Sequence, residues 1–338
     1  MMSVAVVDAL QRPVRDLRIS VTDRCNFRCV YCMPRDVFGP GAQFLPRAEL
    51  LTFEEIARLA RMFVSCGVTK LRITGGEPLV RHDLERLVAL LADIDGVGDI
   101  AMTTNGALLS RKAKLLADAG LRRVTVSLDS LDDEVFRAMN DVAIPVGQVL
   151  EGIEAAVAAG LGHAKINMVV KRGANDDHLL AMAEHFRYTA HTLRFIEYMD
   201  VGSTNGWQLD DVVSAADIVR VVDAQWPLEQ LAPNYPGEVA NRYRYRDGAG
   251  EIGVIASVTQ PFCRGCTRAR LSPEGRLYTC LFAAHGHDLR SLLRDGASDA
   301  EITDRLQSIW VVRSDRYSEL RTAHTSPHAK VEMSRIGG

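Results

Sequence analysis

Three cysteines within eight residues, Cys25, Cys29 and Cys32, are the side chains of this sequence best suited to chemistry. Their C-x3-C-x2-C spacing is too tight for a disulfide framework and supplies one thiolate fewer than a closed four-cysteine metal site. Three thiolates can hold three irons of a 4Fe–4S cube and leave the fourth iron open to a ligand that is not protein. The spacing therefore indicates chemistry at an open iron.

A second group of closely spaced cysteines lies far along the chain, at Cys263, Cys266 and Cys280. Its C-x2-C-x13-C spacing again supplies three thiolates. A structural zinc ion is the alternative at either group, with a histidine as its fourth ligand. His82 is the nearest downstream histidine to the first group and is not local to it, whereas His285 or His287 could complete a zinc site at the second. Zinc therefore stays open as the alternative interpretation.

The bulk composition is that of an ordinary globular protein. The chain has 338 residues, 47% hydrophobic and 25% charged, with 40 basic against 43 acidic side chains and a net charge of −3. This balance argues against a broad nucleic-acid surface but leaves room for a local cationic pocket. No signal-like or membrane-spanning run is found, and the grouped cysteines favour a reducing compartment, so we expect a cytoplasmic protein. The isolated Cys66 is expected to be a buried apolar side chain.

The elements that position the first cysteine group follow a regular alternation between residues 15 and 200. Short apolar runs rich in β-branched residues predict strands at 17–22, 71–74, 100–103, 124–128, 165–170 and 193–198. Segments of helical periodicity between them predict helices at 53–65, 82–93, 110–119, 132–139, 147–159 and 176–188. The first helix opens with a capping box, Thr52 with Glu55. This alternation predicts parallel βαβ units.

Polar or glycine-rich residues follow several of these strands, as at 75–77, 103–106 and 127–130. Because the carboxyl ends of parallel strands meet at one edge of a sheet, they predict a site on that rim. Six such strands could form an open doubly wound sheet. The fold we expect is instead α/β, an incomplete TIM-like (βα)6 barrel with its site at the rim.

The pattern changes after residue 200. Residues 202–206 are interpreted as a linker, antiparallel strands are predicted around 243–245 and 252–258, and helices near 287–295 and 299–311. We therefore predict two domains: the partial barrel at 12–205 and a smaller C-terminal α+β domain at 206–338 that carries the second iron–sulfur cluster.

Two motifs resemble those of radical S-adenosylmethionine enzymes. The stretch SVTDRCNFRCVYCMP, residues 20–34, is similar to the signature of that superfamily, and Thr74-Gly-Gly-Glu-Pro78 is similar to its second motif. S-adenosylmethionine can chelate an open iron through its amino and carboxylate groups. Gly75 and Gly76 would allow a close backbone approach, and Glu77 would place an anion beside the ammonium. The resemblance also implies S-adenosylmethionine contacts at Tyr31, Gly76, Ser127 and Met199.

The C-terminal half narrows the resemblance to one branch. The segment from Thr267 to Gly275, TRARLSPEG, and the ending Met333-Ser-Arg-Ile-Gly-Gly338 resemble the GTP 3′,8-cyclase family of molybdenum cofactor biosynthesis. The likeness runs from about residue 12 to Gly338. It implies two 4Fe–4S clusters, on the first and second cysteine groups. A 5′-deoxyadenosyl radical would remove hydrogen from the ribose 3′ carbon of GTP, and attack on guanine carbon 8 would give 3′,8-cyclo-7,8-dihydro-GTP.

The same resemblance implies the substrate contacts. GTP would be bound by Arg18, Arg72, Thr103, Lys165, Arg268, Ala269 and Arg270. A triphosphate needs several convergent cations, and guanidinium groups suit phosphate oxygens. Strand alternation places Arg72 on the same face as Thr74, which favours an inward orientation. The Gly337-Gly338 tail is expected to reach the active site. No catalytic side chain is expected beyond these cluster and substrate ligands.

Partners and alternatives complete these expectations. The resemblance implies an electron donor and a downstream cyclic pyranopterin monophosphate synthase, and the enzyme would be a monomer or homodimer with no nucleic-acid or membrane partner. One alternative is a radical S-adenosylmethionine maturase that modifies peptides, but such proteins usually carry more C-terminal cysteines. A non-enzymatic iron–sulfur or zinc regulator is the other, and it gives no reason for the Gly-Gly-Glu-Pro motif.

Overall fold

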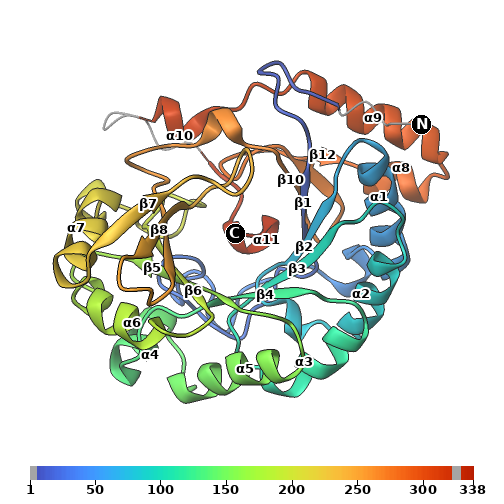
Figure 1. The fold of residues 1–338 in the computed structure, drawn as a ribbon. Coiled ribbons are helices and arrows are strands. Elements are labelled where there is room, and N and C mark those ends of the chain that lie inside the picture. The colour runs from blue at the N-terminus through green and yellow to red at the C-terminus, as the bar shows by residue number, and fades with distance from the viewer. Residues whose placement is uncertain (1–5, 322–328) are drawn as a thin grey trace.

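The computed structural model describes residues 6–321 and 329–338. Its strands form one twelve-stranded sheet in the order β12-β11-β10-β1-β2-β3-β4-β5-β6-β9-β8-β7. The central six are β1 (Asp16–Ser20), β2 (Lys70–Thr74), β3 (Asp99–Thr104), β4 (Arg123–Ser127), β5 (Lys165–Val170) and β6 (Thr192–Glu197), all paired in parallel. Figure 1 shows the sheet curved into an incomplete ring with helices around it. The expected partial barrel is confirmed.

The helices outside the barrel follow the predicted alternation. They are α1 (Phe53–Ser65), α2 (Leu84–Ala92), α3 (Leu109–Asp118), α4 (Asp133–Asn140), α5 (Val146–Ala158), α6 (Leu179–Phe186) and α7 (Ala215–Gln225). Short 3₁₀ turns lie at Arg47–Glu49, Pro78–Val80, Asp176–His178, Leu209–Asp211 and Cys263–Gly265. The capping box of α1 is confirmed, because Thr52 and Glu55 exchange side-chain and backbone hydrogen bonds. Cys66, which ends this helix, is buried as expected.

Each barrel strand has one face toward the helices and one toward the barrel interior. In β5 the buried residues Ile166, Met168 and Val170 alternate with the half-buried residues Lys165, Asn167 and Val169. The apolar set belongs to the main hydrophobic core, whereas the other set lines the interior cavity. Because successive side chains of a strand point to opposite faces, one strand both packs the core and supplies the site.

The C-terminal residues extend this sheet at both edges. Beyond β6 lie β9 (Glu251–Ile255), β8 (Asn241–Tyr245) and β7 (Leu228–Leu231), and beyond β1 lie β10 (Arg268–Leu271), β11 (Arg276–Tyr278) and β12 (His287–Asp288). The prediction of antiparallel strands after residue 200 is therefore incomplete, because β9 pairs in parallel with β6 and β10 in parallel with β1. The division at residue 205 stays a prediction, and residues 322–328 of the second part lie outside the described ranges.

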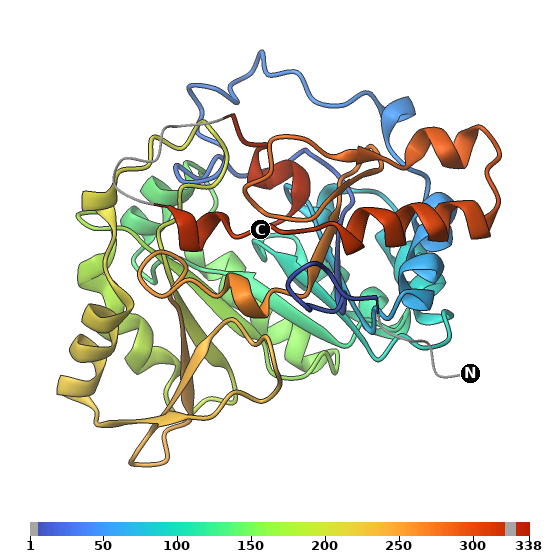
Figure 2. The same cartoon turned by 90° about the horizontal axis from the view of Figure 1, so that it is seen from above.

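The last helices have two different places. Helix α8 (Arg290–Arg294) is shorter than predicted because β12 precedes it, and α9 (Asp299–Val311) matches its prediction. After α10 (Tyr317–Leu320), α11 (Met333–Ile336) lies inside the ring of strands (Figures 1 and 2). Among residues 6–321 and 329–338, no helix combines the length and apolar character that a membrane crossing requires.

The segment 202–206, which was interpreted as a linker, is bound to the C-terminal tail. The Ser203 backbone N–H and the Thr204 hydroxyl both donate to the Glu332 carboxylate, at 3.0 Å each. Gly202 has a φ of +67°, and a Cβ there would collide with the same carboxylate. The segment therefore fastens the chain that leads into α11.

Candidate active site

Both cysteine groups line one cavity inside the barrel. The first group lies on the loop that follows β1, at the carboxyl ends of the parallel strands. Of the second group, Cys263 and Cys266 precede β10 and Cys280 follows β11. None of the cysteines forms a disulfide in the described chain. The structure thus brings together two thiol groups that are more than 200 residues apart in sequence.

The thiols of the first group are partly buried and pack against the hydrophobic core at the wall of the cavity. Burial raises the pKa of Cys25 to about 12, and it also raises the pKa of Cys29 and of Cys32. The Phe27 backbone N–H donates to Cys25 Sγ at 3.3 Å, and Cys29 Sγ donates to Asn140 Oδ1 at 3.0 Å. Thiols in such a setting are protonated without metal, and a metal ion deprotonates the thiols that bind it.

The second group has a more positive setting. The Phe282 backbone N–H donates to Cys280 Sγ at 3.5 Å, and Arg268 Nη2 donates to Cys266 Sγ at 3.4 Å. Burial acts to raise the pKa of Cys266, but the charges of Arg268 and Arg313 outweigh it and lower the pKa to about 6. This thiolate is therefore prepared to bind a metal at neutral pH.

The donor sets fit iron–sulfur clusters better than single metal ions. No cluster of three His, Cys, Asp or Glu side chains in the described residues is arranged to hold one ion. A zinc ion with Zn–S bonds of about 2.3 Å would draw its thiolates close together. The thiolates of a cube bind different irons, and N–H donors to the sulfurs tune such clusters. His285 and His287, the alternative zinc ligands, do not line the cavity that Cys280 lines.

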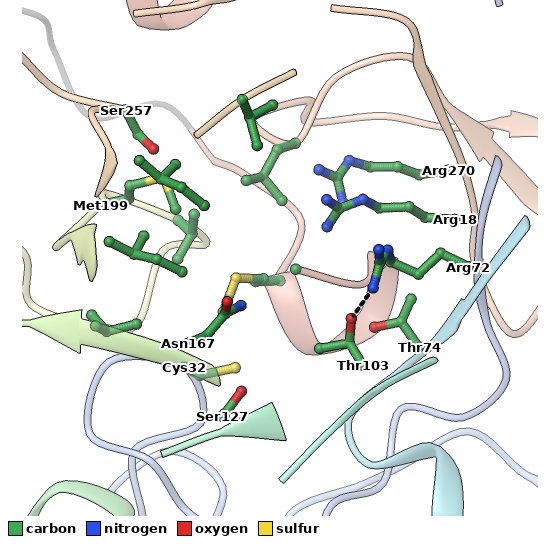
Figure 3. A pocket seen from close by; sticks show the side chains of 18 of the residues that line it. Arg18, Cys32, Arg72, Thr74, Thr103, Ser127, Asn167, Met199, Ser257 and Arg270 are labelled. Atoms are coloured by element: carbon green, nitrogen blue, oxygen red, sulfur yellow. Dashed lines mark hydrogen bonds between the residues drawn. The ribbon is translucent and has the colours of Figure 1, made fainter. Parts of the chain in front are cut away.

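Three arginines form a ladder across one wall of the cavity. Arg18 of β1 is in register with Arg270 of β10 on one side and with Arg72 of β2 on the other. Figure 3 shows the three guanidinium groups stacked and pointing into the cavity. Burial, reinforced by the neighbouring arginines, lowers the pKa of Arg18. Arg18 has no hydrogen bond or ion pair with any residue that the structure describes, which leaves its charge available to a ligand.

Further cations surround this ladder. Burial lowers the pKa of Lys165 to about 8, and the charges of Arg194 and other cations add to the effect. Arg194 Nε donates to Asn167 Oδ1 at 2.9 Å, and Arg72 Nη1 donates to Thr103 Oγ1 at 3.1 Å. Within the described chain, neither Lys165 nor Arg194 has a carboxylate partner within ion-pair distance. Cations that line a cavity without carboxylate partners offer the charge that a polyanionic ligand requires.

The Gly-Gly-Glu motif serves the loop architecture as well as the cavity. A Cβ on Gly75 would lie 2.6 Å from the Thr22 carbonyl oxygen, and one on Gly76 would collide with the Arg24 carbonyl group. The close backbone approach expected of these glycines is therefore made to the cysteine loop. Burial raises the pKa of Glu77 to about 7, and this carboxylate accepts from Thr104 Oγ1 at 2.8 Å and from the Asn105 backbone N–H at 2.7 Å.

The remaining expected S-adenosylmethionine contacts lie near the first cysteine group. Tyr31 is buried, and its hydroxyl donates to Asp129 Oδ2 at 2.8 Å. Ser127 ends β4 and Met199 follows β6, and Figure 3 places both at the cavity together with Cys32. The site residues expected from the sequence thus meet in one place.

Ala269 is the exception among them. It lies in β10 between Arg268 and Arg270, is fully buried, and packs in the hydrophobic core instead of lining the cavity. Strand alternation explains this placement, because both neighbours of an inward residue face outward. The Ala269 side chain therefore does not face a substrate in the cavity.

Several cavity residues were missed by the sequence analysis. They are Lys70, Asn140, Asn167, Arg194, Tyr235 and Ser257. Alternation within the predicted strands would have found both Asn167 and Arg194. Asn167 lies two positions after the inward Lys165, and Arg194 follows the core residue Leu193. Asn140 carried no sequence signal, because its contact with Cys29 depends on how α4 packs against the cysteine loop.

The C-terminal glycines reach the cavity. Gly338 lines it, and the Gly337 carbonyl oxygen accepts a hydrogen bond from Arg270. Gly337 has a φ of +73°, and a Cβ at this position would collide with the Thr74 side chain. The tail therefore lies between the arginine ladder and the strand end that begins the Gly-Gly-Glu motif.

Comparison with known proteins assigns the chain to a class. A family model described as the Radical SAM superfamily matches residues 19–186, and one described as Molybdenum Cofactor Synthesis C matches residues 191–319. A solved structure of Streptococcus suis SuiB bound to the precursor peptide SuiA shares the fold, with a TM-score of 0.62, 15% identity, and coverage of 89% of this chain and 66% of that one. The protein is thus a member of the radical S-adenosylmethionine superfamily.

Full-length relatives place the chain in one family of this superfamily. A protein of Acidothermus cellulolyticus named GTP 3′,8-cyclase is 56% identical, and the match covers 100% of both chains. A GTP 3′,8-cyclase of Staphylococcus aureus is 48% identical over 98% of this chain and 99% of its own. The chain belongs to the GTP 3′,8-cyclase family.

Proposed function

We propose that this protein cyclises GTP to 3′,8-cyclo-7,8-dihydro-GTP, the first step of molybdenum cofactor biosynthesis. One observation carries the proposal: the two open cysteine groups and the ladder of Arg18, Arg72 and Arg270 all face one cavity. A nucleoside triphosphate offers the complementary chemistry, with a polyanionic end for the guanidinium groups and a base for an open iron. The full-length likeness to GTP 3′,8-cyclases supports the guanine nucleotide as substrate.

The cysteine groups define the two ends of the reaction. Cys25, Cys29 and Cys32 would hold one 4Fe–4S cluster, and the second group would hold the other. When bound, the first cluster supplies the electron that cleaves S-adenosylmethionine, and the second supplies an open iron to the guanine. Both thiol groups line the cavity inside the barrel, and bound S-adenosylmethionine and nucleotide would exclude water from it, which would protect a radical from competing reactions.

The other side chains would bind and orient the two small molecules. The arginine ladder with Lys165 would bind the triphosphate, and Arg268, which also contacts Cys266, would lie where the nucleotide meets the second cluster. Tyr31, Gly76, Ser127 and Met199 would line the S-adenosylmethionine side. Orientation is the protein's main contribution, since the cofactors carry the difficult chemistry.

Anaerobic incubation with GTP, S-adenosylmethionine and a strong reductant tests the proposal directly. We expect 5′-deoxyadenosine to form in a GTP-dependent manner, together with the cyclised nucleotide. If a peptide or ATP supports turnover and GTP does not, the substrate is wrong and the peptide-maturase alternative gains support. Metal analysis should give about eight irons per chain; zinc near one per chain would contradict the second cluster.

Replacement of Cys263 by alanine separates the two sites. The variant should keep the iron of the first cluster and lose productive GTP turnover. Cys66→Ala is the matched control, because Cys66 is buried but lies outside both groups. Cyclisation retained by the Cys263 variant would overturn the role of the second group.

The wider setting is part of the same proposal. An electron donor must supply the first cluster, and a cyclic pyranopterin monophosphate synthase would consume the product. The cytoplasmic location, the monomeric or homodimeric state and the division into domains at 12–205 and 206–338 stay predictions.

A further inference from the structure

A buried ionic cluster outside the cavity joins the segment before β1 to the segment after α9. It consists of Asp8, Arg12 and Arg313, whose side chains are 0%, 2% and 1% exposed. Asp8 Oδ2 accepts from Arg12 Nε at 2.6 Å and from Arg313 Nη1 at 2.9 Å. None of the three lines the cavity. Their contacts can therefore act on the site only through other residues.

Three further hydrogen bonds from the two arginines go to backbone carbonyl groups of the second cysteine group and its neighbour Thr279. Arg12 Nη1 donates to the Cys263 carbonyl oxygen at 2.7 Å, and Arg313 Nη1 donates to the Cys266 carbonyl oxygen at 2.9 Å. Arg313 Nε donates at 3.0 Å to the carbonyl oxygen of Thr279, the residue before Cys280. The cluster thus holds the backbone at, or next to, all three cysteines.

Trp310 and Asp315 hold both arginines in place. The Trp310 indole N–H donates to the Arg12 carbonyl oxygen at 3.1 Å, and the Arg313 guanidinium lies 4.6 Å from the Trp310 ring centroid. Asp315, which is partly exposed, approaches Arg313 Nε at 3.4 Å and accepts from Arg12 through its carbonyl oxygen at 2.8 Å. The donors therefore present a rigid frame to the cysteine loops.

Stability alone is a weak reason for this arrangement. Buried ion pairs cost desolvation energy, and well-packed apolar residues often replace them without loss of stability. A planar guanidinium, however, can bind several acceptors in fixed directions, which an apolar side chain cannot do. The geometry at the carbonyl groups is what the two arginines add.

We propose that Asp8, Arg12 and Arg313 are positioning residues for the second iron–sulfur cluster. They fix the backbone of the segments 263–266 and 279–280 so that the three thiolates converge on one cube. This inference rests on the proposed function only in that the second cysteine group must hold a cluster. It adds residues that neither touch the cavity nor belong to any motif discussed above.

Two cysteine backgrounds of the full chain allow a test. Alanine at Cys25, Cys29 and Cys32 leaves a chain with only the second cluster, and alanine at the second group leaves a chain with only the first. In each background, a ferrous chelator withdraws iron, and visible absorbance follows the rate. Arg12→Lys and Arg313→Lys keep the charge but lose the fork of donors. We expect each to speed iron loss about tenfold or more from the second-cluster chain and to leave the first-cluster chain unchanged.

Matched variants separate positioning from general stability. Arg187→Lys changes another mostly buried arginine, paired with Asp247 away from both cysteine groups, and should alter neither rate. Asp8→Asn is isosteric and serves if the lysine variants do not fold; it should also affect only the second-cluster chain. Equal rates with and without the variants, or equal acceleration in both backgrounds, would overturn the proposal. A second-cluster chain that binds no iron even with all three residues intact would refute the two-cluster function itself.

Discussion

Burial in the cavity disfavours the charged form of its arginine side chains. Arg18, Arg72 and Arg270 stand in register on adjacent strands, and each has a lowered pKa chiefly because of burial. Charges held this way repel one another, and a bound polyanion relieves that repulsion. The arginines that we propose to bind the triphosphate are therefore also those whose mutual repulsion disfavours the empty cavity.

Arg18→Ala should weaken GTP binding while S-adenosylmethionine binding stays the same. A hydrogen bond to a charged group contributes about 1.5–3 kcal/mol, so we expect a loss of about tenfold or more in affinity. Equilibrium binding of each ligand to the reconstituted protein measures this. Arg244→Ala is the control, because its ion pair with Glu229 is exposed and remote from the cavity. An unchanged GTP affinity in the Arg18 variant would show that the arginine ladder does not bind GTP.

Lys165 should make GTP affinity depend on pH. Its pKa is about 8 in the empty cavity, and a bound triphosphate would raise that pKa. The contribution of Lys165 to the affinity should therefore be constant below pH 8 and fall as the pH rises through 8 toward the higher pKa of the complex, with proton uptake on binding. The arginines stay protonated throughout this range. Calorimetry in buffers of different ionisation enthalpy measures the uptake; Lys165→Met should abolish it, and uptake that persists in this variant would assign it to another group.

At the scale of elements, the site is completed by short segments outside the barrel strands. The tail with α11 enters the ring, and its entry is bound to residues 200–204: Glu332 binds residues 203 and 204, and Lys330 Nζ donates to Asp200 Oδ2 at 2.7 Å. The loop after β2 packs against the loop after β1 through Gly75 and Gly76. These contacts keep three separate segments at one rim.

Gly337→Ala should displace the tail without loss of the clusters. The added Cβ would collide with Thr74 in a backbone conformation that favours glycine, so Gly338 could not keep its place in the cavity. We expect turnover to fall roughly tenfold or more, a loss of about 1.4 kcal/mol in transition-state stabilisation, at unchanged iron content. Gly173→Ala is closely matched, with a φ of +71° but open space around its Cβ. Equal activity of both variants would mean that the tail is dispensable.

The extent of sequence-based prediction differs between these elements. The bounds of α1, β5 and α9 matched, because capping boxes and local periodicity define them. The cysteine groups and the inward Arg72 also followed from spacing and alternation. The place of β10 beside β1, the entry of α11 and the contact of Asn140 with Cys29 did not, because each depends on residues that meet only after the chain has folded.

On the scale of the whole molecule, the sheet is continuous across residue 205, where the sequence predicted a domain boundary. Residues before 205 supply β1 to β6, and later strands pair with both outer members of that set. Both edges of the partial barrel are therefore covered by the C-terminal part. Exposed parallel edges are prone to association with other chains.

A fragment of residues 12–205 should consequently not behave as an independent folded domain. We expect it to aggregate or to show little amide protection, because the edges of β1 and β6 lose their partners. Size-exclusion chromatography and hydrogen exchange measure this, and co-expression with residues 206–338 should restore the folded state. A monomeric, well-protected fragment would instead support two autonomous domains.

The parallel pairing of β1 with β10 also bears on the order of folding. It joins residues 16–19 to 268–271, so the chain must close a very long loop before this contact forms. Loop closure of that length slows folding and leaves early intermediates with an unpaired strand edge beside the first cysteine loop. The arginine ladder, which needs β10, would be among the last features to assemble. Iron delivered during synthesis would then meet the first cysteine group before the nucleotide pocket exists.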